Sequence, residues 1–404
     1  MGFKVLVLGV GAQGRVLSYL FDKTDSVEEL RLAGRRFEKV KRYAETLDRA
    51  IAYKADAYNI DEICNAAKGV DLIVNAVLPE HNLYVMKAAL KVNANYIDMA
   101  FGPPYDNIDK ELELGDEFKK RDLVAITSTG ITPGTTNILA ACAADELDKI
   151  DYIKIVDAEV VDSDVPISSW SPETFIADCI EYDTFVYEDG ELKRVKPFSG
   201  EEVINFPVIG PQKVYYHAHE EQVTLWRFIK KPIKKIEFKI GGPALEFLAQ
   251  LYSLGLLSRE PIEVKGVKIA PLDVYLALVP RPPTPEQLRE YIEKNILRYA
   301  QEVTMVEVTG YRDNEFNRYT YYVYSPPIKE IISKVPPANH GSYLTSTGCY
   351  ILSRMIGEGL ISERGVIVPE ALNREERVRY IKANMEWIDP HIKIELKVEK
   401  VLAI

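Results

Sequence analysis

Residues 4–14 read KVLVLGVGAQG, a short apolar run followed by the glycine pattern Gly-x-Gly-x-x-Gly. The apolar run predicts a buried strand, and RVLSYL at residues 15–20 predicts an amphipathic helix. In this order the first glycine permits a tight turn, the second lets a pyrophosphate approach the backbone, and the third lets the helix pack on the strand. The alternative is a glycine turn that serves packing alone. The stretch predicts a dinucleotide site formed by Gly9, Gly11, Ala12, Gln13 and Gly14.

Strands and helices alternate through the first 130 residues. Short continuous apolar runs, such as Leu72-Ile73-Val74, predict strands that are buried on both faces. Alternation with short links predicts a doubly wound parallel sheet whose strand C-termini share one ligand-binding edge. The expected strands cover residues 4–8, 29–33, 50–54, 71–76, 95–98 and 123–128, and the clearest helices cover 38–47, 81–92 and 108–121. We therefore expect an α/β Rossmann domain that binds NAD(P) over residues 1–130.

The end of the second strand bears on the choice of cofactor. NAD-binding domains usually place Asp or Glu there to bind the ribose 2′-hydroxyl. This chain has Gly34-Arg35-Arg36 instead, and guanidinium groups pair with a 2′-phosphate. The sequence favours NADP, with NAD as the alternative; a solvated helix start would also carry such arginines. Asp56 is expected to bind the adenine amino group, and Asn75 and Val77 to border the ribose and nicotinamide.

Beyond residue 130 the expected strands are longer and alternate more clearly between apolar and polar residues. Runs of strands with separate helices predict an α+β substrate-binding domain with a mostly antiparallel sheet over residues 131–340. A C-terminal segment, residues 341–404, is expected to return to the Rossmann domain. The strands cover 153–161, 235–240, 303–309, 319–324 and 393–401, and the helices 136–146, 244–254, 271–278, 285–299 and 345–357.

Composition excludes several classes of protein. The net charge is -11 and no basic stripe interrupts it, so we expect binding neither to nucleic acid nor to an anionic membrane. No apolar run approaches the ~20 residues that span a bilayer, and the chain begins in a strand rather than a signal peptide. Four scattered cysteines suit reduced thiols in a cytoplasmic protein. Many Glu, Lys, Ile and Tyr beside six Met are typical of a thermophile.

Three groups are candidates for acid–base catalysis on an amine. His217 and His219 lie two residues apart on an expected strand and so face the same side, where a histidine can shuttle protons and Glu221 can orient it. Asp98 ends the fifth strand at the ligand edge. The alternatives are a structural histidine pair and a turn-capping Asp98. We expect no metal, because neither a Cys nor a third His completes the His-x-His pair.

Two segments are candidates for holding a substrate carboxylate. Thr132-Pro133-Gly134-Thr135-Thr136-Asn137 opens a helix whose free N–H groups would bind an anion, with Thr132 and Asn137 in contact with the substrate. Proline and threonine also occur at helix starts for structural reasons. Arg312 is the second candidate, against the simpler interpretation of a solvated turn.

Longer segments resemble the saccharopine dehydrogenase-like oxidoreductases, and within them the L-lysine 6-dehydrogenase branch. The resemblance is carried by residues 9–14, 96–98 with Gly102, 130–139, 217–225 and 356–370. It implies a Rossmann domain and an α+β domain whose sheet walls the substrate site and often the subunit interface, hence a homodimer or higher homo-oligomer. It also implies hydride transfer between a nicotinamide and the carbon that bears an amino-acid side-chain nitrogen.

One departure bears on the substrate. Saccharopine-type members look like Gly-Leu-Asp-Pro-Gly with an Asp-His pair at the helix start, where this chain has Thr132 before Pro133, and Asn137. The departure favours a smaller amino-acid substrate, with L-lysine oxidised to its 6-semialdehyde and ammonia released. Lysine dehydrogenases are associated with NAD, which Arg35 and Arg36 oppose. The alternatives are a saccharopine dehydrogenase or other imine reductase, and a nicotinamide-binding redox sensor without catalysis.

Overall fold

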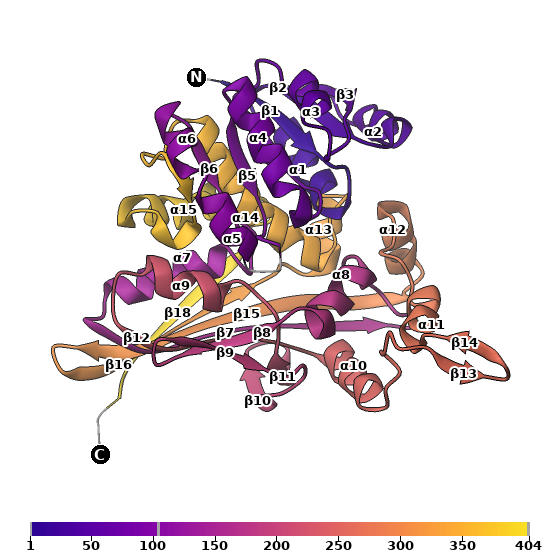
Figure 1. Ribbon diagram of the computed structural model, residues 1–404, viewed down its shortest axis with the longest axis vertical. Coiled ribbons are helices and arrows are strands. Elements are labelled where there is room, and N and C mark those ends of the chain that lie inside the picture. Colours follow the sequence, from indigo (N-terminus) through magenta and orange to yellow (C-terminus); the bar gives the residue numbers. More distant parts are fainter. Residues whose placement is uncertain (1, 103–105, 402–404) are drawn as a thin grey trace.

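Two large β-sheets organise the computed structural model, which describes residues 2–102 and 106–401. The first sheet lies near the N-terminus and the second spans the opposite half of the molecule, with α14 (His340–Gly357) between them (Figure 1). This arrangement confirms the expected fold class, a Rossmann-like parallel sheet joined to an α+β domain.

The first sheet is parallel throughout and has the order β17-β6-β5-β4-β1-β2-β3. The order in which successive strands are added reverses between β1 and β4, and a doubly wound sheet binds ligands at such a point. The strands are β1 Phe3–Leu8, β2 Val27–Gly34, β3 Ala50–Lys54, β4 Leu72–Asn75, β5 Asn95–Asp98, β6 Val124–Ile126 and β17 Gly365–Ile367.

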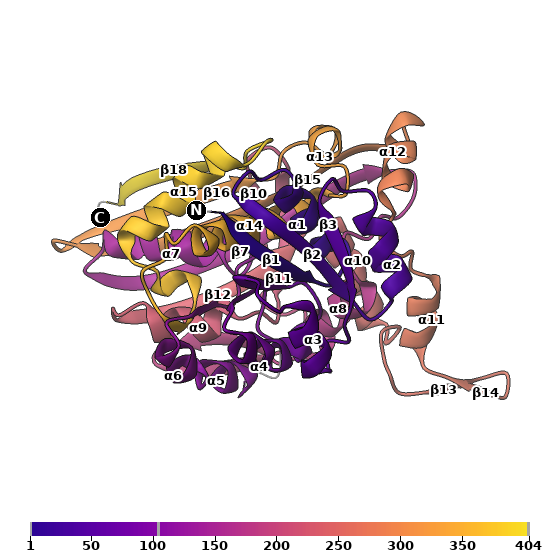
Figure 2. The ribbon, with the colours of Figure 1, turned by 90° about the horizontal axis from the view of Figure 1, so that it is seen from above.

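Helices cover both faces of the first sheet (Figure 2). On one face, α1 packs against α14; on the other, α3 and α4 enclose a second apolar core. The helices of this half are α1 Ala12–Asp22, α2 Phe37–Ala44, α3 Ile60–Ala66, α4 Asn82–Val92, α5 Asp106–Leu112 and α6 Gly115–Lys120, with the short η1 at Pro79–His81. The single helix expected over 108–121 is therefore wrong; the break falls beside Gly115, a poor helix former.

The second sheet is mostly antiparallel, as expected, with the order β10-β11-β12-β7-β15-β16-β18 and with β8 and β9 attached to β12; only β12 and β7 are parallel. The strands are β7 Lys149–Ser163, β8 Thr184–Glu188, β9 Glu191–Val195, β10 Glu202–Phe206, β11 Gly210–Tyr216, β12 Ile233–Gly241, β15 Leu297–Arg312, β16 Glu315–Tyr324 and β18 Lys393–Val401. A separate hairpin consists of β13 Ile262–Val264 and β14 Val267–Ile269.

The helices after residue 130 flank this sheet or join it to the first. The helix expected over 285–299 is too long, because the backbone of Asn295 is left-handed (φ 55°) and β15 begins at Leu297. The helices are α7 Thr135–Asp145, α8 Pro172–Ile176, η2 Ala177–Glu181, α9 Glu221–Phe228, α10 Pro243–Ser253, α11 Pro271–Leu278, α12 Pro285–Glu293, α13 Ile328–Lys334, η3 Pro369–Ala371 and α15 Arg374–Trp387.

The C-terminal segment serves both sheets. Strand β17 pairs with β6 in the first sheet, and α14 packs closely enough that a Cβ at Gly348 would lie 2.4 Å from the carbonyl oxygen of Gly130. Strand β18 instead pairs with β16 at the edge of the second sheet. The expectation that this whole segment returns to the Rossmann domain is therefore wrong for β18. Over the described ranges, no helix combines the length and apolar character needed to cross a bilayer.

Candidate active site

A cavity of about 730 Å³ runs from the carboxyl ends of the first sheet into the second domain. Its outer end is lined by the glycine turn and the ends of β2, β3 and β4, and its inner end by residues of β7, β12 and β15. The cavity therefore joins the predicted dinucleotide site to the predicted substrate domain.

The three glycines of the turn play different roles. A Cβ at Gly9, where φ is 105°, would lie 2.7 Å from the Ala76 carbonyl oxygen, and one at Gly14 would lie 1.9 Å from that of Gly9. Packing therefore requires glycine at both positions. A Cβ at Gly11 would meet nothing within 4 Å, and Gly11, Ala12 and Gln13 line the cavity at the start of α1. This opening beside a helix N-terminus fits a pyrophosphate.

Arg35 and Arg36 line the outer cavity together with Lys39. Partial burial lowers the pKa of Lys39, and repulsion from Arg15 and Arg36 lowers it further. The group is thus an excess of positive charge at the end of β2, where an NAD site would carry a carboxylate. A 2′-phosphate dianion would neutralise it, so the residues present fit NADP.

The other predicted cofactor contacts also line this end of the cavity, in Asp56, Asn75 and Val77. Asp56 Oδ1 accepts the Tyr58 N–H at 3.1 Å. Asn75 is buried, donates to Asn82 Oδ1 at 2.8 Å, and accepts the Val77 N–H at 3.3 Å. Its role toward the nicotinamide ribose stays a prediction, since its side chain already braces the loop after β4.

Asp98 lies at the end of β5, on the cavity wall and almost wholly buried. The Tyr96 hydroxyl donates to Oδ2 at 2.8 Å and the Ser128 N–H to Oδ1 at 2.8 Å. Burial raises the pKa of Asp98 to about 7, although both hydrogen bonds oppose the shift. The carboxyl group can therefore hold or release a proton near neutral pH.

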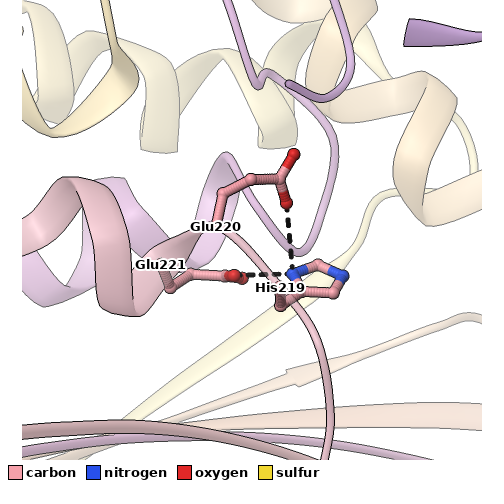
Figure 3. A group of neighbouring side chains, drawn as sticks. All are labelled: His219, Glu220 and Glu221. Carbon is pink, nitrogen blue, oxygen red and sulfur yellow. Dashed lines mark hydrogen bonds and ion pairs between the residues drawn. The ribbon is translucent and has the colours of Figure 1, made fainter. Parts of the chain in front are cut away.

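The two histidines lie in the loop between β11 and α9, so their expected place on a strand is wrong; β11 ends at Tyr216. His219 Nδ1 lies 2.6 Å from Glu221 Oε2 and 3.6 Å from Glu220 Oε2 (Figure 3). Burial alone would lower the pKa of His219, but its attraction and hydrogen bond to Glu221 outweigh this and raise it to about 9. The ring also stacks on Phe238, with centroids 4.1 Å apart.

His217 has the opposite electrostatic character. Its Nδ1 donates to the Ala218 carbonyl at 3.1 Å, and its Nε2 lies 3.6 Å from Cys179 Sγ. Burial lowers the pKa of His217 to about 3, helped by repulsion from His219. Both rings line the cavity. At neutral pH the site therefore holds one imidazolium, His219, and one neutral imidazole, His217.

The start of α7 does not offer the expected free donors. Thr135 and Thr136 N–H groups donate to the carbonyls of Gly130 and Ile131, both at 3.0 Å, and the Gly134 N–H donates to Asn137 Oδ1 at 3.1 Å. The idea that this helix start binds a carboxylate is therefore wrong. Thr132 lines the cavity, whereas Asn137 does not.

Two further predicted substrate contacts lie outside the cavity lining. Asn137 Nδ2 donates to Glu370 Oε2 at 3.1 Å, which ties α7 to η3. Arg312 stands at the end of β15, half-exposed, and pairs with Glu146 at 3.1 Å. Glu221 is fully buried and reaches the cavity only through His219. The structure thus brings together Asp98, Thr132, His217 and His219 but leaves Asn137 and Arg312 apart from them.

Three carboxylates of the inner cavity are absent from the sequence prediction: Asp157 on β7, Asp178 on η2 and Glu302 on β15. Asp157 Oδ1 accepts from the Thr304 hydroxyl at 2.7 Å. Burial raises the pKa of Asp157 to about 6 and of Asp178 to about 7, and that of Glu302 rises well above its usual range. The sequence holds no clear signal for them, because β7 and β15 carry several other charged residues.

The two ends of the cavity differ in their ionisable groups. Arg35, Arg36 and Lys39 line the outer end, after β2. Among the described lining residues from 131 onward there is neither Lys nor Arg, and the ionisable side chains are His217, His219 and the acids Asp157, Asp178 and Glu302. The outer end therefore suits an anion, whereas the inner end offers carboxyl groups that can pair with an ammonium group.

Comparison with known proteins agrees with the division of the chain into an NADP-binding domain and a second domain. Residues 5–160 match the family model described as the saccharopine dehydrogenase NADP binding domain, and residues 130–387 match the saccharopine dehydrogenase C-terminal domain. In fold, the chain is similar to saccharopine dehydrogenase (L-Glu forming) from Saccharomyces cerevisiae, with a TM-score of 0.69 and 15% identity over 99% of this chain and 100% of that one.

Two curated relatives are similar in sequence. Carboxynorspermidine synthase of Vibrio cholerae is 29% identical over 304 residues, which is 69% of this chain and 73% of the relative. Carboxyaminopropylagmatine dehydrogenase of Synechocystis is 25% identical over 383 residues, 92% of this chain and 93% of the relative.

The family models together span almost the whole described chain, and the first of them is an NADP-binding domain. The resemblance to the saccharopine dehydrogenase family, NADP as a cofactor and the assignment as an enzyme are confirmed, whereas the L-lysine 6-dehydrogenase branch stays a prediction. The chain belongs to the saccharopine dehydrogenase family of NAD(P)-dependent oxidoreductases.

Proposed function

We propose that this enzyme transfers a hydride between NADP and the carbon of a C–N bond in a carboxylated polyamine. In the reductive direction, an imine carbon gains the hydride and the nitrogen gains a proton, which leaves a secondary amine. NADP supplies or accepts the hydride when bound. The residues of this chain bind the amine and move the proton.

The main support for this proposal is the set of carboxyl groups that line the inner cavity. An ammonium group beside a buried carboxyl group lowers the pKa of that carboxyl group and is attracted to it more strongly than in water. Asp157, Asp178 and Glu302 therefore favour a substrate with several ammonium groups. A substrate whose charge is mostly carboxylate would meet these acids without a lysine or arginine to offset them. L-Lysine and saccharopine both bring carboxylates, and saccharopine brings more than one.

The names of the relatives point the same way. Carboxynorspermidine and carboxyaminopropylagmatine are both polyamine derivatives that bear a carboxyl group. The relative covered over 93% of its length is named a dehydrogenase. A carboxylated polyamine is therefore the substrate class that agrees with both the cavity and the relatives.

His219 is the proposed proton donor to the substrate nitrogen, and the proton acceptor in the reverse direction. It lines the cavity and stays protonated up to a pKa of about 9 because Glu221 lies 2.6 Å away. Glu221 is thus a positioning residue. Asp98, at the end of β5, is the proposed second acid–base group beside the nicotinamide site.

The test is an absorbance assay at 340 nm with purified enzyme and NADP⁺ at alkaline pH. Carboxynorspermidine and carboxyaminopropylagmatine are compared with L-lysine and saccharopine. We expect at least one carboxylated polyamine to give a kcat/KM about 10-fold or more above both amino acids. The reaction expected from the sequence is oxidation of L-lysine with release of ammonia. A higher kcat/KM for L-lysine than for either carboxylated polyamine would contradict the proposal.

A pair of variants on β15 tests whether the acids of the inner cavity select the substrate. Glu302→Gln removes a cavity acid, and Glu307→Gln removes an acid of β15 that pairs with Arg318 outside the cavity. We expect the first to raise the KM for the polyamine about 10-fold and the second to change it less than 3-fold. Equal effects would show that the charge of the cavity does not select the substrate.

A further inference from the structure

The start of α14 forms part of the wall of the inner cavity. Gly341 and Thr345 line the cavity, and the Ser346 hydroxyl, one residue further along the helix, donates to Gln13 Oε1 of the glycine turn at 2.6 Å. The first turns of α14 therefore run from the inner cavity toward the predicted pyrophosphate site. Of the two lining residues, Gly341 is the one without a side chain.

Gly341 leaves a gap between two other residues of the cavity wall. A Cβ at this position would lie 3.5 Å from Trp170 Cζ3 and 3.6 Å from Glu302 Oε2, and both residues line the cavity. A side chain here would therefore stand between the indole ring and the carboxyl group. The helical backbone does not require glycine, which is a poor helix former. Space in the cavity is one reason for glycine, and close packing is the other, because the same Cβ would lie 3.2 Å from Ser169 Cβ.

Glu302 lies among other acids. Its cross-strand neighbour on β7 is Glu159, whose Oε2 lies 3.0 Å from His340 Nε2. Burial alone would raise the pKa of Glu159, but the hydrogen bond and the attraction to His340 outweigh this and lower it. Burial raises the pKa of Glu302 well above its usual range, and repulsion from Asp157 and Glu159 raises it further. A positive group beside Glu302 would offset both effects, as His340 does for Glu159.

We propose that the gap bounded by Trp170, Glu302 and Gly341 is a cation subsite that receives one ammonium or guanidinium group of the substrate, and that Gly341 determines specificity by keeping it open. This assignment rests on the proposed function, because it gives one charged group of a polyamine its place in the cavity. It also accounts for a glycine at a helical position where alanine would form the better helix.

The test measures binding rather than turnover. Norspermidine, whose charged groups are ammonium groups, and agmatine, which ends in a guanidinium group, are titrated by calorimetry into the full-length enzyme saturated with NADP⁺. We expect at least one of them to bind, and the tighter of the two identifies the group that the subsite prefers. Gly341→Ala should raise its Kd about 10-fold or more, because the added methyl group occupies the subsite.

Gly115→Ala is the matched control. Gly115 is the first residue of α6, and an added Cβ would meet its nearest neighbour, the Val366 nitrogen, at 3.5 Å and away from the cavity lining. The Kd for the amine should stay within about 3-fold of the wild-type value in this variant. Unchanged circular dichroism and NADP⁺ affinity would show that both variants are folded. Equal Kd values in the two variants would overturn the proposal, and so would a wild type that binds neither amine.

A second variant separates an occupied subsite from crowding against Ser169. Glu302→Gln should raise the Kd about 10-fold in the wild type but less than about 3-fold in Gly341→Ala, because both changes remove the same contact. Effects that multiply would mean that the methyl group acts elsewhere, and would contradict the subsite. Trp170→Leu, which leaves α14 unaltered, should also raise the Kd about 5-fold or more. An unchanged Kd in that variant would contradict the subsite even if Gly341→Ala did not fold.

These measurements distinguish a wrong subsite from a wrong reaction. If no carboxylated polyamine reduces NADP⁺ but an amine binds and loses affinity in Gly341→Ala, the subsite stands and the proposed reaction is wrong. If a carboxylated polyamine is oxidised with the same KM in Gly341→Ala and Gly115→Ala, the reaction stands and the subsite is wrong.

Discussion

Arg35 and Arg36 are the side chains that we propose to set the choice of cofactor. Both line the outer cavity, and neither has a carboxylate at the end of β2 beside it, because that position is Gly34. Burial lowers the pKa of Lys39, and repulsion from Arg15 and Arg36 lowers it further; a bound anion would offset that repulsion. Under this proposal, NADP is favoured by relief of repulsion in the unliganded site as well as by attraction to the phosphate.

Replacing both arginines tests this account. Arg35→Ala/Arg36→Ala should raise the KM for NADP⁺ about 10–100-fold, as expected for the loss of charge-assisted hydrogen bonds. The KM for NAD⁺ should change less than 3-fold, because NAD lacks the 2′-phosphate. Steady-state kinetics with both cofactors measures the two values. Equal effects on both would contradict the phosphate-binding role.

Glu221 offers a test of the proton donor at the same scale. The raised pKa of His219 keeps the ring protonated below about pH 9, so imine reduction should fall as the pH rises through that value. In Glu221→Gln the attraction is lost while burial still lowers the pKa, so the fall should begin at least one pH unit lower. The pH profile of kcat for reduction measures the shift.

Glu370→Gln is the control for that profile. Glu370 is a buried acid near Glu221, but it bonds Asn137 rather than His219. Burial raises the pKa of Glu370 to about 7, so glutamine resembles its protonated form. A profile that shifts equally in both variants would mean that general burial of acid, and not the ion pair, sets the pH dependence.

At the scale of elements, the sequence motif before α7 correctly predicts a helix start but wrongly predicts a carboxylate-binding site. Its proline, glycine and threonines are typical of a helix start, and the helix begins at Thr135. The donors that make such a start an anion site are taken by the Gly130 and Ile131 carbonyls and by Asn137. Sequence alone does not reveal this, because these acceptors depend on the backbone path before the helix.

Asn137→Ala separates the structural role of that residue from the substrate role predicted for it. The variant loses the Gly134 cap and leaves the Glu370 carboxyl with fewer partners, which should destabilise the fold by about 1–3 kcal/mol. The KM for the amine should stay within 3-fold, since Asn137 is not on the cavity wall. Thermal unfolding and kinetics measure the two effects. A KM raised 10-fold at unchanged Tm would favour the substrate role.

Other parts of the site were predictable to different degrees for physical reasons. The glycine turn and the arginines after β2 follow a local pattern, so their residues line the cavity as expected, except Gly14, which packs against Gly9 instead. Asp157 and Glu302 come from strands far apart in sequence, and only the register that pairs Thr304 with Asp157 brings them into one cavity. Likewise, β18 was located as a strand, but which sheet it would join depends on pairing across the whole fold.

At the scale of the whole molecule, several buried carboxyl groups around the cavity have raised pKa values. Asp98 and Asp178 have pKa values of about 7 in the folded protein, against about 3.9 in an unfolded chain. The folded state therefore holds protons that the unfolded state releases. These groups cost stability as the pH rises from about 4 to about 7, and the cost is complete above that range.

Asp178→Asn isolates one such group, because asparagine cannot ionise. Near pH 4 the ligand-free variant and wild type should unfold at similar temperatures. At pH 8 the variant should be more stable, by about 1–3 kcal/mol. Calorimetry across this pH range measures the difference. A gap that stays constant with pH would show that Asp178 does not titrate with a raised pKa.

The path of the chain between the two sheets has a consequence for inheritance and engineering. The chain leaves the first sheet after β6, builds most of the second, returns with β17 and leaves again to end in β18. Neither half is a detachable module, since a cut after residue 130 removes the edge strand of one sheet and α14 from its face. We therefore expect an exchange of either half to disrupt packing between the two sheets. Changes of substrate are expected to come from substitutions of cavity residues within the intact fold.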